Sequence, residues 1–116
     1  GRKVIGMVAE EGDRVVAYMI YELDRKRVRL ANIAVHPDFR GMGVGTALIA
    51  SLQGKLSEGR RVRICTEVRE RNLDAQLFFK QFGFEAINVL RDFYVDTDED
   101  CYVFVFRHSS LMEVLA

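Results

Sequence analysis

Three glycines at alternate positions, Gly41, Gly43 and Gly45, are the part of the sequence best suited to binding a ligand. They follow Arg40 and come directly before a stretch in which leucines recur at helical spacing. The first amides of a helix have no internal partner and carry the positive end of its dipole, and glycines let the backbone approach a ligand closely. Residues 40–46 therefore predict a backbone cradle for phosphate groups, to which Arg40 adds a charge-assisted contact.

The end of this loop narrows the class of phosphate ligand. A Walker-type nucleotide loop needs a lysine before its Ser or Thr, and here Gly45 stands directly before Thr46. A dinucleotide-binding fingerprint needs a third Gly or Ala where Thr46 stands, and it directly follows a strand. Both classes are disfavoured, although Glu67 lies about where the ribose-binding acid of a dinucleotide domain is expected. A glycine-rich turn that binds nothing is the plain alternative.

Alternating apolar residues predict the strands that must position the loop. The expected strands are residues 3–10, 14–23, 27–35, 60–68, 84–90 and 100–107. Polar turns join the first three as an antiparallel meander. The second half of the third strand alternates less, as if it were buried on both faces. An acidic loop, residues 96–99, separates the last two strands.

Two segments have helical periodicity. Leu48, Leu52 and Leu56 predict a helix over residues 45–58, which Gly59 ends. A second helix is expected over residues 72–82, with Asn72 as its N-cap, Gly83 as its C-cap, and an apolar stripe. The members of that stripe are Leu73, Leu77, Phe78 and Phe82.

The resulting order is β-β-β-α-β-α-β-β, which predicts an α/β fold of the mixed-sheet α+β kind with helices packed on the sheet. Residues 1–116 are expected to form a single domain, with a core over residues 3–107 and a C-terminal tail over residues 108–116. A short helix is expected at residues 109–116. Edges of the sheet could pair between chains, so a dimer is left open.

The composition excludes several classes of protein. Lysine plus arginine and aspartate plus glutamate number 17 each, so a strongly basic nucleic-acid footprint is absent and no nucleic-acid partner is expected. Cys65 and Cys101 lie in apolar runs and are expected to be buried, reduced thiols. The spacing of His and Cys predicts no metal site, and no apolar stretch predicts a membrane span or a signal peptide. These absences predict a cytoplasmic protein that binds no membrane.

The glycine loop and several later segments resemble the GNAT superfamily of N-acetyltransferases. Residues 40–45 match its acetyl-CoA signature, Gln/Arg-x-x-Gly-x-Gly/Ala, and residues 32–39 resemble the strand that runs along the pantetheine arm. Residues 67–72 and 75–84 also match in order. Residues 91–94, followed by the acidic loop, are most similar to the ribosomal-protein alanine N-acetyltransferases and related protein N-terminal acetyltransferases. The resemblance covers roughly residues 3–107.

The resemblance implies transfer of an acetyl group from acetyl-CoA to a primary amine, most simply a protein N-terminal α-amine. The residues implied to contact acetyl-CoA are Ile33, Ala34, Val35, Arg40, Gly41, Met42, Gly43, Val44, Gly45, Thr46, Asn72 and Phe79. The loop amides would hold its diphosphate, and the strand its pantetheine arm. Glu67 would act as general base on the amine, directly or through water, and Tyr94 as general acid on the departing thiolate.

These roles agree with the chemistry of the step, because an amine attacks a thioester only when it is unprotonated, and a tyrosine hydroxyl can donate to a developing thiolate. Each residue also has a simpler interpretation. Glu67 could be a solvated carboxylate at a strand end, Tyr94 could only pack on the sheet, and Asn72 could only cap its helix. Cys65 has no histidine close in sequence and is not expected to be a nucleophile.

Two departures from the family pattern leave alternatives open. Many members carry tyrosine where Phe79 stands, and Phe79 cannot donate a proton. Members usually have a strand and two helices ahead of the segment that matches residues 3–10, and these form one wall of the acceptor site. The acceptor could therefore be a small-molecule amine or a lysine side chain, and a non-catalytic CoA-binding module is a third interpretation.

Overall fold

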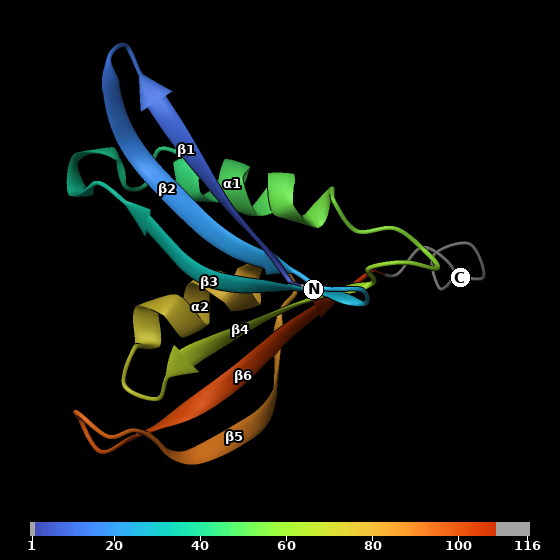
Figure 1. The fold of residues 1–116 in the computed structure, drawn as a ribbon. Helices are drawn as coiled ribbons and strands as arrows, with labels where there is room; N and C mark the ends of the chain where they lie inside the picture. The colour runs from blue at the N-terminus through green and yellow to red at the C-terminus, as the bar shows by residue number, and fades with distance from the viewer. Residues whose placement is uncertain (1, 109–116) are drawn as a thin grey trace.

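The computed structural model describes residues 2–108 as a six-stranded mixed sheet with helices packed against one face (Figure 1). The elements are β1 (Lys3–Glu11), β2 (Arg14–Leu23), β3 (Arg27–Val35), a 3₁₀ turn (Pro37–Phe39), α1 (Val44–Gln53), β4 (Arg63–Arg69), α2 (Leu73–Gln81), β5 (Glu85–Tyr94) and β6 (Glu99–Arg107). The strand order is β1-β2-β3-β4-β6-β5. Only β3 and β4 run parallel, and the other neighbours are antiparallel. The predicted fold class and element order are confirmed.

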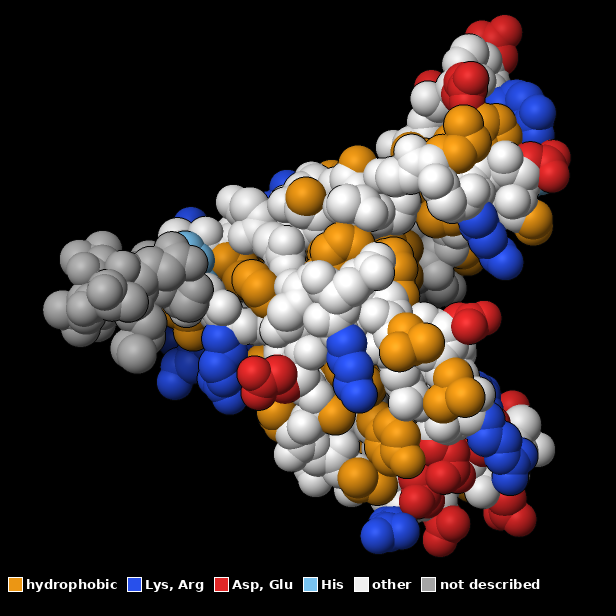
Figure 2. Space-filling view, turned by 180° about the vertical axis from the view of Figure 1, so that it is seen from behind, with side chains coloured by type: hydrophobic (Ala, Val, Ile, Leu, Met, Phe, Trp, Pro, Cys, Tyr) orange, Lys and Arg blue, Asp and Glu red, His pale blue; other side chains and the backbone are white. Residues whose placement is uncertain are grey.

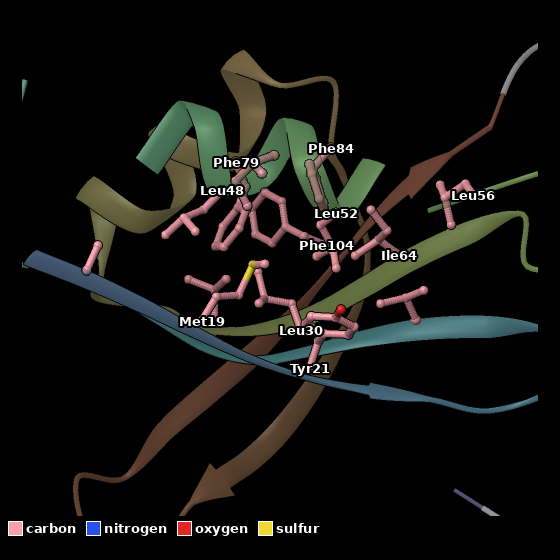
Figure 3. Close-up of a cluster of buried hydrophobic side chains, with 14 residues drawn as sticks. Met19, Tyr21, Leu30, Leu48, Leu52, Leu56, Ile64, Phe79, Phe84 and Phe104 are labelled. Atoms are coloured by element: carbon pink, nitrogen blue, oxygen red, sulfur yellow. The ribbon is translucent and has the colours of Figure 1, made fainter. Parts of the chain in front are cut away.

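The core lies between the helices and one face of the sheet (Figure 3). Leu48 and Leu52 of α1 and Phe79 of α2 point toward the sheet, where they meet side chains such as Leu30 and Phe104. These five side chains are at most 5% exposed. Burial of this apolar surface is the main source of stability, and it fixes both helices relative to the strands.

Both helices differ in detail from the sequence prediction. The first ends at Gln53 and not at residue 58, because Gly54 is its C-cap and the chain turns there toward β4. The apolar stripe of the second was partly wrong: Leu73 and Leu77 are 64% and 66% exposed. Its buried side is formed by Phe79, with Ala75, Phe78 and Phe82 packed beside it. Asn72 caps this helix as predicted, since its side chain accepts from the amide of Ala75.

The strand boundaries also required corrections. β4 begins at Arg63 and not at residue 60, and β5 continues past Leu90 to Tyr94. A register irregularity between Leu90 and Tyr94, with Asp92 at a φ of 52°, lets β5 bend and continue. The predicted acidic loop is therefore shorter, and its last member, Glu99, is the first residue of β6 and only 5% exposed.

Both cysteines, Cys65 and Cys101, are free and buried, as expected. Among residues 2–108 no helix is long and apolar enough to cross a membrane. The expected helix at residues 109–116 lies outside the described part of the chain.

The tight turn between β2 and β3 depends on Asp24. One carboxylate oxygen accepts from the amides of Lys26 and Arg27, both at 2.9 Å, and the other accepts from the Arg27 guanidinium at 3.0 Å. These donors favour the charged form and, led by the Lys26 amide, lower the pKa of Asp24 to about 2.

Replacing Asp24 with Asn should therefore produce a pH-dependent loss of stability. A carboxyl whose pKa is lowered by folding stabilises the protein above its unfolded pKa, and this contribution disappears as the pH falls through its folded pKa. Because the side chain is 38% exposed, solvent screening limits the difference at pH 7 to roughly 1 kcal/mol or less. Urea unfolding at pH 7, 4 and 2 should show the two proteins converging toward pH 2. A difference that stays constant over this range would contradict the assignment.

Candidate functional site

The two parallel strands of the sheet pair for only four residues and then separate. β3 and β4 are in register from Arg27 with Arg63 to Leu30 with Thr66, and no later pair forms along the described chain. The Thr66 hydroxyl donates to the Leu30 carbonyl at 3.0 Å, at the last pair. Beyond this point β3 and β4 diverge, as Figure 1 shows. In the space-filling view of Figure 2, a notch lies between two protruding parts of the molecule.

A β-bulge lies where the strands separate. In the pairing with β2, Ile20 matches Asn32 and Tyr21 matches Leu30, so Ala31 is an extra residue in β3. A bulge bends its strand and increases the local twist, which turns the second half of β3 away from β4. The prediction that this half would be buried on both faces was wrong, because Ala31 and Asn32 are exposed and Ile33, Ala34 and Val35 are only half-buried.

A cavity of about 570 Å³ occupies the helix side of this gap. Its walls are the second half of β3, the glycine loop with the start of α1, and one side of α2. The lining residues are Ile33, Ala34, Val35, Phe39, Arg40, Gly41, Gly43, Val44, Gly45, Thr46, Asn72, Asp74, Ala75, Phe78, Phe79 and Gln81. The structure thus gathers every predicted cofactor-contacting residue except Met42, which is 65% exposed and does not line the cavity.

Several lining residues were missed at the sequence level. These are Phe39, Asp74, Ala75, Phe78 and Gln81. Of those on α2, Ala75 is three residues from Asn72 and four from Phe79, and Phe78 is in turn three or four residues from Ala75, Asp74 and Gln81, so helical spacing links them because residues three or four apart share a face. The signal for Phe39 is weaker, since it depends on the 3₁₀ turn that joins β3 to the loop.

The glycine loop has the geometry of an anion cradle. Gly41 and Gly43 have φ values of 76° and 84°, in the left-handed region that favours glycine. Gly43 is the N-cap of α1 and offers no side-chain cap, and the first turn carries no acidic residue. The first amides of α1 therefore keep their hydrogen-bonding capacity and the positive end of the helix dipole for a ligand.

The glycine loop also packs against α2 and is hydrogen-bonded to the end of β3. A Cβ on Gly45 would lie 3.2 Å from the ring of Phe78, so the start of α1 packs tightly against α2. The Arg40 guanidinium donates to the Val35 carbonyl at 3.2 Å, which ties the loop to the end of β3. Asn72 accepts from the Ala75 amide and also lines the cavity, so capping and ligand contact are compatible roles.

Glu67 and Tyr94 lie together, but on the opposite face of the sheet from the helices. Glu67 pairs with Val103 of β6, and Tyr94 pairs with Glu99. Since alternate residues of β6 share a face, both side chains lie on the face that also carries Cys101. Glu67 is the first β4 residue beyond the last pair with β3, so it stands at the inner end of the gap. Glu67 does not line the cavity, which lies on the helix side of the same opening.

Tyr94 is placed to keep its proton. Burial, the neighbouring Cys101 thiol and the nearby charge of Glu67 raise its pKa to about 12. The Arg69 guanidinium lies over the ring, 4.0 Å from its centre. Burial is also the main reason that the pKa of the Cys101 thiol is raised, so this thiol stays protonated as well.

Arg69, which sequence analysis did not single out, links the end of β4 to the turn between β5 and β6. It donates to both carboxylate oxygens of Asp96 at 3.3 Å and to the Thr97 hydroxyl at 2.8 Å. It also lies 3.5 Å from the carboxylate of Glu99, whose other oxygen accepts from the Arg71 amide at 3.2 Å. This network holds the end of β5, and hence Tyr94, against β4.

A second hollow, of about 440 Å³, lies at the other end of the sheet, where β3 and β4 are still paired. Its lining residues are Arg2, Asp24, Arg25, Lys26, Arg27 and Arg63. None of the predicted site residues contributes to it. The chemistry-bearing groups are thus concentrated at the open end of the sheet.

The sequence that forms this site also matches a known protein family. The family model for the acetyltransferase (GNAT) domain matches residues 3–86. The chain belongs to the GNAT acetyltransferase family. The match includes the whole cavity wall, from β3 through α2.

Individual GNAT proteins agree with this assignment. The chain is 28% identical over 98 residues to the ribosomal protein bS18-alanine N-acetyltransferase of Escherichia coli K12, covering 84% of this chain and 66% of that protein. A crystal structure of the E. coli ribosomal-protein-S18-alanine N-acetyltransferase superposes with a TM-score of 0.79 at 25% identity, over 90% of this chain and 68% of that one. Arabidopsis thaliana Naa50, in complex with the bisubstrate analogue CoA-Ac-MVNAL, gives a TM-score of 0.80 at 28% identity, over 87% and 71%.

The chain is shorter than these GNAT proteins. It spans 64% of the length of the related Bacillus subtilis protein and 66% of the E. coli one. The matched part contains the loop, the cavity and the Glu67–Tyr94 pair.

Replacing Arg69 with Ala should lower the urea midpoint of unfolding measurably, because the buried Glu99 carboxylate would lose its cationic neighbour and Tyr94 its ring contact. Arg91 provides the matched control: its ion pair with Asp100 is 3.3 Å long, but its side chain is 83% exposed. Arg91→Ala should cost less than about 0.5 kcal/mol. Equal losses for both variants in urea unfolding would show that Arg69 is an ordinary surface ion pair.

Proposed function

We propose that this chain transfers an acetyl group from acetyl-CoA to a primary amine, and that the acceptor is a protein N-terminal α-amine. The observation that supports this most strongly is the gap between β3 and β4, with a glycine cradle at its mouth and a carboxylate at its inner end. A ligand with a diphosphate at one end and a reactive thioester at the other fits such a gap. Related proteins with the same fold carry this activity in their names.

Different cavity residues would bind different parts of acetyl-CoA. The amides of residues 41–46 would donate to the diphosphate at the start of α1, and the Arg40 guanidinium would add charge. The edge of β3 that faces the gap has no strand partner beyond Leu30 among the described residues, so its backbone can bond the amide groups of a pantetheine arm. Asn72 and Phe79 would line the arm from α2. The similarity to Naa50, which is bound to a CoA-containing analogue, supports this use of the gap.

Glu67 and Tyr94 supply the proton transfers. The acceptor amine approaches from the face of the sheet that carries both side chains, and the thioester reaches them through the gap. The Glu67 carboxylate accepts the proton that the amine loses, directly or through water, as nitrogen bonds to the acetyl carbon. The carbon–sulfur bond then breaks, and Tyr94 donates its proton to the departing thiolate. With a pKa of about 12, Tyr94 holds this proton throughout the neutral and moderately alkaline range.

Phe79 cannot replace Tyr94 as the proton donor. It is 4% exposed and packs against Phe78 and Phe84, with ring centres 5.3 Å and 5.2 Å away. Its ring therefore shapes the cavity wall and the core without a polar group. Tyr94 is the phenol that lies near Glu67, and this supports assigning the acid role to it.

The preference for a peptide N-terminus comes from the relatives. The E. coli relative is named for an alanine of a ribosomal protein, and the Naa50 analogue joins CoA to a peptide that begins with Met. Four acceptors separate the alternatives: peptides that start with Ala or Met, an N-terminally blocked peptide that contains lysine, and a free small amine. Turnover confined to the unblocked peptides would support the proposal, whereas preference for lysine or the free amine would assign another acceptor.

Glu67→Gln should lower kcat by about 100-fold or more, since general acid–base catalysis contributes on this scale, and Tyr94→Phe should lower it by about 10-fold or more. KM for acetyl-CoA should change little in either variant, because neither side chain lines the cavity. Between pH 6 and 10 the unaltered chain should show no loss of kcat from Tyr94 ionisation, because its pKa is about 12. Wild-type rates in both variants would exclude them from the reaction.

A further inference from the structure

Arg29 is the nearest cationic partner of Glu67, although it belongs to another strand. It lies in β3 opposite Cys65, and Cys65 and Glu67 are two residues apart on the same face of β4. Its Nε donates to Glu67 Oε1 at 2.8 Å, and Nη2 donates to the same oxygen. Its Nη1 donates to Glu22 Oε1 at 3.2 Å on β2. One guanidinium therefore joins three adjacent strands just before the sheet opens.

In this contact, only one of the two carboxylate oxygens of Glu67 accepts hydrogen bonds from Arg29. Both bonds from Arg29 go to Oε1 of Glu67, and no residue between 2 and 108 donates to Oε2. The Glu67 side chain is 23% exposed, so solvent or an acceptor can reach it. A carboxylate held at one oxygen by two donors has a fixed orientation, and its second oxygen keeps its lone pairs available.

Glu22, the second carboxylate bound by Arg29, is itself held in place. Glu22, which receives the third donor, also contacts the Arg2 guanidinium at 3.4 Å, and its side chain is only 17% exposed. The side chain of Arg29 is 34% exposed, and the pKa of its guanidinium is raised, chiefly by the bond to Glu67. The Arg29 side chain therefore cannot rotate without losing its hydrogen bonds to Glu67 and Glu22.

We propose that Arg29 is a positioning residue for the reaction. It fixes Glu67 through Oε1, so that Oε2 is presented at the inner end of the gap to receive the proton of the acceptor amine. This inference rests on the proposed function, because it assigns Arg29 a role only through Glu67. It differs from a purely structural role, in which Arg29 would stabilise the sheet and affect the rate equally whether or not Glu67 can accept a proton.

Arg29→Gln should lower kcat by about 10-fold or more and leave KM for acetyl-CoA within about threefold, since Arg29 does not line the cavity. The same substitution in a Glu67→Gln background should change kcat by less than about twofold, because coupled residues are not additive. Arg29→Lys keeps the charge but offers no planar pair of donors, and it should recover part of the lost rate. Single-turnover kinetics measure the rates of the unaltered chain and of all these variants even when they are low.

Arg27→Gln is the matched control. Arg27 lies two residues earlier on the same strand and face, but it is paired with Asp24 and not with Glu67. It should leave kcat within about twofold of the unaltered chain. Folding of each variant is checked by its urea midpoint, and Arg29→Lys provides a second test if Arg29→Gln does not fold.

The outcomes separate this inference from the proposed function. A wild-type kcat in Arg29→Gln, or an equal loss of rate in the native and Glu67→Gln backgrounds, would overturn the positioning role while acetyl transfer stands. No turnover by the unaltered chain on any amine would overturn both. If Arg29→Gln fails to fold and Arg29→Lys shows no loss of rate, the paired donors of the guanidinium are not required and the inference fails.

Discussion

The separation of two parallel strands after four pairs is the constraint on which the rest of the structure depends. β3 and β4 each continue past Leu30 and Thr66, but the bulge at Ala31 turns β3 away. Both strands remain ordered because β2 continues to pair with β3, and β6 with β4. A sheet that opened without these outer partners would leave backbone groups unpaired on both sides. The opening is therefore stable, and it leaves one edge of β3 free for a ligand.

The sheet also divides the site into two parts with different chemistry. On the helix side, the cavity is lined by backbone, glycines and aromatic rings, which suit a phosphate-bearing arm. On the other side lie Glu67 and Tyr94, with the Arg29 guanidinium bonded to the carboxylate and the Arg69 guanidinium over the phenol ring. In the proposed reaction, the gap between β3 and β4 is the route by which a bound thioester would reach Glu67 and Tyr94.

Much of this could be predicted from the sequence, and the failures have physical reasons. The glycine loop and the order of elements follow from local patterns, because turn glycines, caps and periodicity are local properties. The extent of α1 was overestimated because Leu56 continues the helical spacing past Gly54, yet it packs into the core from the turn that follows. Leu73 and Leu77 were misassigned because apolar residues also occupy exposed positions. The links through Arg29, Arg69 and Glu99 join residues 28 to 38 apart in sequence, and no local pattern reports such pairs.

In the proposed complex, backbone amides at the mouth of the gap hold the diphosphate of acetyl-CoA. Calorimetric titration of acetyl-CoA into the unaltered chain and into Gly43→Ala, with Gly59→Ala as reference, tests it most directly. Gly43 and Gly59 have similar positive φ values, 84° and 80°, and open space where a Cβ would lie, but only Gly43 lines the cavity. Both variants should lose about 1 kcal/mol of stability through backbone strain, whereas only Gly43→Ala should bind acetyl-CoA about 10-fold or more weakly. No binding to the unaltered chain, or equal affinity in both variants, would contradict the account.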